Sequence, residues 1–61
     1  MLKTIDEFVA RVSSLADIGD AYDVFEDECS ADLRKSIYSF ADEDSVEPFR
    51  SAMYNLGFKD Y

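Results

Sequence analysis

The stretch that decides the fold spans residues 17–30 and has the sequence DIGDAYDVFEDECS. Because apolar residues at helical spacing share one face, this stretch predicts an amphipathic helix that begins near Asp17. Gly19 weakens the first turn of that helix or marks the corner before it. The apolar side chains of the predicted stripe are Ile18, Ala21, Tyr22, Phe25 and Cys29.

The residues before this stretch predict another short helix with one buried face. Thr4 is expected to cap its first turn, and Glu7, three residues later, completes a capping box. In that motif each of the two side chains accepts a hydrogen bond from the backbone amide of the other residue. The apolar face of this helix consists of Ile5, Phe8, Val9, Val12 and Leu15 or Ala16.

A third helix is expected to begin at Ser30, because serine is favoured as an N-cap. Its buried residues are predicted to be Leu33, Ile37, Phe40 and Ala41. Its outward residues are predicted to be Asp32, Arg34, Lys35, Ser36 and Ser39.

A polar connection over residues 41–44 leads to a fourth predicted helix. This helix begins at Ser45, or at Asp44 with Glu47, and tolerates Pro48 because first-turn amides have no acceptor inside the helix. Gly57 is placed to adopt the left-handed conformation that ends a helix, with the final residues 58–61 folding back onto the core. The predicted buried face consists of Val46, Phe49, Ala52, Met53 and Leu56.

The chain has 61 residues, which suffices for one domain. Short helices joined by short connections can share one core only as a compact bundle. The sequence therefore predicts an all-α protein, a bundle of three to four short helices forming a single helical domain over residues 1–61. For a chain of this size a single core supplies a free energy of unfolding of roughly 3–5 kcal/mol.

The charge balance is strongly acidic, with 14 Asp and Glu against 6 Lys and Arg and no His, for a net charge of −8. This charge repels nucleic acids and anionic lipids, so we expect neither direct nucleic-acid binding nor membrane binding. It favours a basic protein or nucleoprotein complex as the partner. The alternative is that the charge serves only to keep a small protein soluble.

The acids concentrate in a run that contains no basic residue. If residues 17, 20, 23 and 27 lie on one helix, their carboxylates form a ridge beside the apolar stripe. Like charges at these spacings cost a few tenths of a kcal/mol each, by rough estimate, so the run is interpreted as a binding surface. Its members are Asp17, Asp20, Asp23, Glu26, Asp27, Glu28 and Asp32.

A second acidic cluster and two aromatic residues complete the predicted binding surface. Asp42, Glu43 and Asp44, followed by Glu47, extend or duplicate the negative charge. Tyr38 and Tyr54 fall outside the buried stripes of their helices, and aromatic residues with a polar tip are favoured at protein interfaces. The alternative for both tyrosines is that they cover the edges of a small core.

The sequence does not predict an enzyme. It lacks His, the usual base for Ser or Cys attack, and Cys29 lies on an apolar stripe next to acids that raise its pKa. The acidic clusters do not have the spacing of a twelve-residue calcium loop, and two isolated glycines cannot form a phosphate-binding loop. We therefore expect no catalytic residue, no metal and no cofactor.

The single cysteine, Cys29, cannot form an internal disulfide. No signal-peptide pattern and no stretch of membrane-spanning length occurs in the sequence. These features predict a soluble protein of a reducing cytoplasm.

In size, charge, helical pattern and lack of catalytic residues, the chain resembles the small inhibitors encoded by phages and mobile elements, including anti-CRISPR proteins and antirestriction DNA mimics. The resemblance implies non-catalytic inhibition of a nucleic-acid-processing complex, such as a CRISPR effector or a restriction nuclease. Inhibition would occur by occupying the nucleic-acid-binding surface or by locking a moving part. The alternatives are an acidic intracellular adaptor, an antitoxin or immunity-type protein with a basic partner, and a chain that completes its core as a homodimer.

Overall fold

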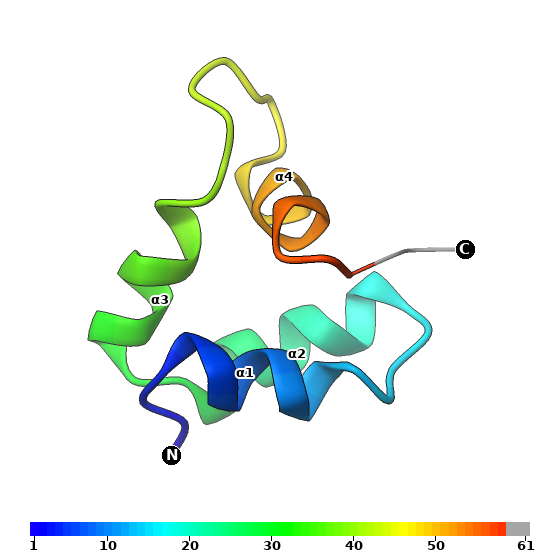
Figure 1. Ribbon diagram of the computed structural model, residues 1–61, viewed down its shortest axis with the longest axis vertical. Helices are drawn as coiled ribbons and strands as arrows, with labels where there is room; N and C mark the ends of the chain where they lie inside the picture. The colour runs from blue at the N-terminus through cyan, green and yellow to red at the C-terminus, as the bar shows by residue number, and fades with distance from the viewer. Residues whose placement is uncertain (59–61) are drawn as a thin grey trace.

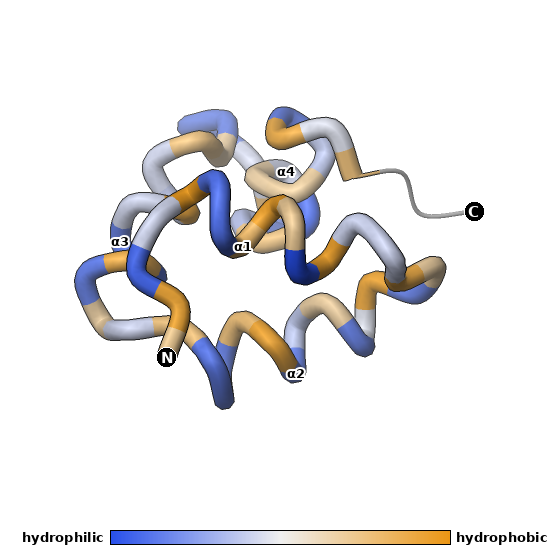
Figure 2. Tube along the Cα trace, turned by 60° about the horizontal axis from the view of Figure 1, so that its bottom comes forward, coloured by the Kyte–Doolittle hydropathy of each residue, from blue (hydrophilic) through white to orange (hydrophobic). Residues whose placement is uncertain are grey.

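The computed structural model describes residues 1–58, and its central element is the helix that the stretch 17–30 predicts. This helix, α2 (Ile18–Glu28), lies beside α1 (Ile5–Val12), as Figures 1 and 2 both show. Hydrophobic and hydrophilic positions alternate along each helix in Figure 2, as expected for short amphipathic helices. The buried face of α2 includes Val24, which the predicted stripe omitted.

The predicted capping box of the first helix and the predicted start of the second helix near Asp17 are confirmed. The Thr4 side chain accepts a hydrogen bond from the Glu7 amide, and a Glu7 carboxylate oxygen accepts from the Thr4 amide at 3.0 Å. Hydrogen bonds from the backbone amides of Lys3 and Thr4 lower the pKa of Glu7. At the start of α2, the Asp17 carboxylate accepts from the Gly19 amide at 2.7 Å.

Two further helices, α3 (Ala31–Tyr38) and α4 (Pro48–Asn55), pack on the other side of the core. The long connection between them rises away from the helices in Figure 1. Ser30 caps α3 by accepting a hydrogen bond from the Leu33 amide, as predicted. Over residues 1–58 the fold is therefore an all-α bundle of four short helices.

The predicted end of α4 is also confirmed. Gly57 has a φ of 98°, a backbone angle that residues with a Cβ atom rarely adopt. Its amide donates to the Tyr54 carbonyl, and the Phe58 amide donates to the Met53 carbonyl, both at 3.0 Å. This pair of bonds is the Schellman motif, and Phe58 packs against the core. The prediction that the last residues also fold back extends to residues 59–61, which lie outside the described part of the chain.

Two side chains predicted to be buried are exposed. Phe40 is 42% exposed because α3 ends at Tyr38, so the helical stripe does not continue to residue 40. Val46 is 94% exposed because α4 begins at Pro48 rather than at Ser45. Proline disfavours helical geometry in the residue before it, and Glu47 accordingly has φ −129° and ψ 80°. The prediction that residues 45–47 form the first turn of this helix is therefore wrong.

The N-terminal residues make a contact that the sequence pattern did not indicate. The Leu2 amide donates to the Glu28 carbonyl at 2.6 Å, and the Ser30 amide donates to the Leu2 carbonyl at 3.0 Å. These bonds form an isolated parallel bridge between Leu2 and Cys29. The bridge ties the start of the chain to the junction of α2 and α3.

The core draws residues from all four helices and centres on Phe25. The Phe25 ring lies 6.5 Å from the Phe8 ring, 4.9 Å from the Phe49 ring and 5.2 Å from the Tyr38 ring, measured between centroids. Among the described residues no polar or charged residue is buried. The buried residues are Phe8, Val12, Ala21, Val24, Phe25, Cys29, Leu33, Ile37, Ala52 and Met53.

We predict that Ile37→Ala destabilises the fold by about 2–5 kcal/mol, because it removes a fully buried side chain and leaves a cavity. Val46→Ala, its matched control, changes stability by less than about 0.5 kcal/mol because Val46 is exposed. Urea denaturation followed by circular dichroism measures both. Comparable losses in the two variants would contradict the position of α4.

Candidate partner-binding surface

The outer face of α2 carries three acids, which we call the α2 ridge: Asp20, Asp23 and Asp27. Their spacings of three and four residues place them on one side of the helix, and all three are exposed. Ala21 and Phe25, on the other side of the helix, are buried in the core. Within residues 1–58 no ion pair or hydrogen bond engages the three ridge carboxylates.

The remaining acids of the run do not join this ridge. Asp17 is the N-cap of α2, so its carboxylate is turned toward the helix end rather than along the outer face. Glu28 forms an ion pair with Arg11 of α1, with N–O distances of 3.0 and 3.1 Å. Asp32 lies in the first turn of α3, where a negative charge is favourable. The predicted run therefore does not act as a single surface in the structure.

Glu26 is exposed and lies beside Tyr22. A hydrogen bond to the Glu26 carboxylate, together with its negative charge, raises the pKa of the Tyr22 hydroxyl. The Tyr22 ring stacks on Phe25 with centroids 5.7 Å apart. These contacts hold the ring at the edge of the core, beside the ridge.

Arg34 reaches back from α3 to the end of α2. Its Nη1 donates to the Cys29 carbonyl at 3.0 Å and to the Glu26 carbonyl at 3.5 Å. A cation at a helix C-terminus stabilises the helix dipole. Arg34 of α3 thus supplies a cation at the C-terminal end of α2, although within residues 1–58 it does not pair with the ridge.

An open groove of about 700 Å³, which we call the aromatic groove, lies between α2 and the start of α4. Its aromatic lining comes from Tyr22, Tyr38 and Phe49. Two ridge residues, Asp20 and Asp23, also line it. The further lining residues are Ile18, Gly19, Glu47, Pro48 and Arg50.

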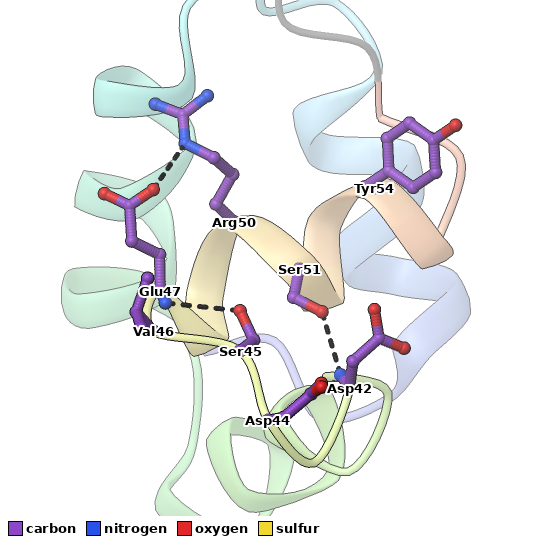
Figure 3. Close-up of a pocket in the computed structure, with 8 residues that line it drawn as sticks. All are labelled: Asp42, Asp44, Ser45, Val46, Glu47, Arg50, Ser51 and Tyr54. Atoms are coloured by element: carbon purple, nitrogen blue, oxygen red, sulfur yellow. Dashed lines mark hydrogen bonds and ion pairs between the residues drawn. The ribbon is translucent and has the colours of Figure 1, made fainter.

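Three acids of the second cluster, Asp42, Asp44 and Glu47, line another hollow, of about 380 Å³, beside α4 (Figure 3). Asp42 and Asp44 of the connection lie on one side of it, and the Arg50–Glu47 ion pair, at 3.2 Å, lies on the other. The hollow and the aromatic groove share Glu47 and Arg50, so the two acidic regions adjoin there. Glu43 is exposed but does not line this hollow.

The two tyrosines of the predicted binding surface, Tyr38 and Tyr54, occupy different environments. Tyr38 is 41% exposed and packs its ring edge-on against Phe25, so one side of it belongs to the core and the other to the aromatic groove. Tyr54 is 76% exposed and lies beside the second hollow (Figure 3). Only Tyr38 of the two adjoins the α2 ridge through a shared groove.

Cys29 is buried, with 2% of its surface exposed. Burial raises the pKa of its thiol, and the Glu28 charge raises it further, while Arg34 lowers it. Within the described part of the chain no three potential metal ligands come together, and no helix is long and apolar enough to cross a membrane.

Comparisons of this chain with protein-family models, with curated proteins and with solved structures found no match.

We predict that Cys29 reacts with an aromatic disulfide reagent at least about a hundredfold more slowly in the native protein than in urea, because the reaction requires opening of the core. Absorbance of the released thiolate measures both rates at one pH. Equal rates in the two conditions would show that the thiol is accessible in the native state.

Proposed function

We propose that this protein is a non-catalytic inhibitor that binds a basic, nucleic-acid-binding surface of a partner complex through the α2 ridge. The partner is proposed to be a nucleic-acid-processing complex such as a CRISPR effector or a restriction nuclease. The observation that carries the proposal is that three carboxylates of one helix face point outward with no cationic partner within residues 1–58.

The spacing of the ridge charges suits a groove built for a nucleic-acid strand. Asp20 and Asp27 are seven residue steps apart, which is about 10 Å along the helix axis. Three charges over that length lie about 5 Å apart along the axis, a spacing of the same order as the roughly 3.4 Å between phosphates of one DNA strand. A Lys/Arg-lined surface can therefore contact several ridge carboxylates at once.

The scaffold under the ridge is held at both ends. Asp17 caps the N-terminus of α2, and Arg34 bonds the carbonyls at its C-terminus. The Arg11–Glu28 pair adds a link to α1, of about 0.2–1 kcal/mol because both side chains are more than a third exposed. A surface that is already ordered loses less entropy on binding.

An acidic adaptor, antitoxin or immunity-type protein would use the same surface toward a different basic partner. The homodimer alternative finds less support, because one chain already buries residues of all four helices in a common core. Binding experiments on candidate complexes distinguish these alternatives from the proposed function.

We predict that the triple variant Asp20→Lys, Asp23→Lys, Asp27→Lys loses at least about a hundredfold in inhibition, because attraction becomes repulsion at three adjacent positions. The assay measures DNA or RNA binding by a panel of purified CRISPR effector complexes and restriction nucleases, with and without this protein. Wild-type inhibition is expected to weaken as salt rises from 50 to about 300 mM.

The matched control is Asp42→Lys, Glu43→Lys, Asp44→Lys, which changes the net charge by the same amount at the second cluster. It is expected to reduce inhibition by less than about tenfold through the loss of long-range steering. Circular dichroism checks that both variants remain helical. Full inhibition by the ridge variant would contradict this site, and inhibition of no complex in the panel would favour the adaptor alternative.

A further inference from the structure

We infer that the aromatic groove receives an arginine side chain of the basic partner. The inference rests on the proposed function, since it names the group that the acidic surface recognises. The groove combines exposed aromatic surface with carboxylates at its rim, a combination that fits a flat cation.

The aromatic rings are fixed in place by one another. Tyr22 meets Phe49 edge-to-face, with centroids 5.0 Å apart and ring planes at 81°. Tyr38 meets Phe25 in the same manner at 5.2 Å and 69°. Tyr22 and Tyr38 are 39% and 41% exposed, so each residue is partly covered by the core and partly open to solvent. A ligand that enters the groove meets preformed π-surface and need not order it.

The rim supplies the charge. Asp20, Asp23 and Glu47 line the groove together with Arg50, so three negative groups and one positive group give a local charge of −2. Arg50 lies at the α4 end, 3.2 Å from Glu47. The α2 side of the groove therefore presents two carboxylates, Asp20 and Asp23, to a cation that enters over the tyrosines. Among residues 1–58 neither carboxylate has an ion-pair or hydrogen-bond partner.

Arginine fits this combination better than lysine. Its planar guanidinium stacks on an aromatic face and still directs N–H groups sideways to carboxylates, and it is less strongly hydrated than an ammonium group. A lysine ammonium gains the charge attraction but cannot stack as a plane. An anionic or nucleotide ligand would be repelled by the acidic rim and by the net charge of −8.

The test compares hexaarginine with hexalysine, two peptides of equal charge. Isothermal titration calorimetry is expected to give about fivefold tighter binding of hexaarginine to the wild-type protein. The preference should persist when salt weakens both affinities, because stacking is screened less than long-range charge attraction. In nitrogen–proton correlation spectra, hexaarginine should shift the amide signals of Tyr22, Tyr38 and Phe49 more than hexalysine does.

Tyr38→Leu removes a π-face while keeping apolar volume, and it should reduce the preference to less than about twofold. Tyr54→Leu is the matched control, since Tyr54 lies outside the groove, and it should keep the full preference. If Tyr38→Leu proves unfolded by circular dichroism, the amide shifts of the wild-type protein decide the question.

The outcomes separate this inference from the proposed function. Equal binding of the two peptides to the wild-type protein would overturn the arginine site, as would amide shifts confined to the region of Asp27. In either case, ridge-dependent inhibition of a nuclease would still support the proposed function. An arginine preference that needs Tyr38, found together with full inhibition by the ridge variant, supports the groove as an arginine site and overturns the ridge as the inhibitory surface.

Discussion

The packing of Phe25 is the interaction on which the rest of the structure depends. Its ring contacts aromatic rings of α1, α2, α3 and α4, so this one side chain connects all four helices. Aromatic pairs of this kind stabilise by roughly 0.5–1.5 kcal/mol each beyond the area they bury, which matters in a chain with such a small core. The same packing holds Tyr22 and Tyr38 at the surface, where they line the aromatic groove.

The stability of the core also allows α2 to carry like charges that repel one another on its outer face. An isolated α2 would be weakened by repulsion along Asp20, Asp23 and Asp27, and its last turn contains no base of its own. In the folded protein, Arg34 supplies a cation at that end and Arg11 pairs with Glu28. These cations come from α3 and α1, so tertiary structure compensates the C-terminal end of the helix, while the ridge carboxylates have no ion pair within residues 1–58. The repulsion is concentrated on the surface that we propose for binding.

Local signals in the sequence predicted most of the fold. The capping box at Thr4, the cap at Ser30 and the left-handed Gly57 each depend on a few neighbouring residues, and all three are confirmed. The positions of Phe40 and Val46 were predicted wrongly because helical periodicity was continued past the points where the backbone leaves the helix. The restriction that Pro48 places on Glu47 was the signal that would have corrected the second error.

The candidate site was predictable only in part, because it depends on contacts between distant segments. Spacing alone grouped Asp20, Asp23 and Asp27 with Asp17, whose carboxylate caps the helix in the structure. The predicted run also included Glu28, which forms an ion pair with Arg11. The groove between α2 and α4 has no sequence signature, since Tyr38, Phe49 and Asp20 come from three elements.

Asp20 and Asp23 belong to both the ridge and the groove, so the charges proposed to steer a basic partner also lie at the rim where an arginine would be held. The charges that attract the basic partner and the groove that would hold its arginine therefore lie next to each other on one helix. This arrangement lets a small surface combine fast association with a specific contact.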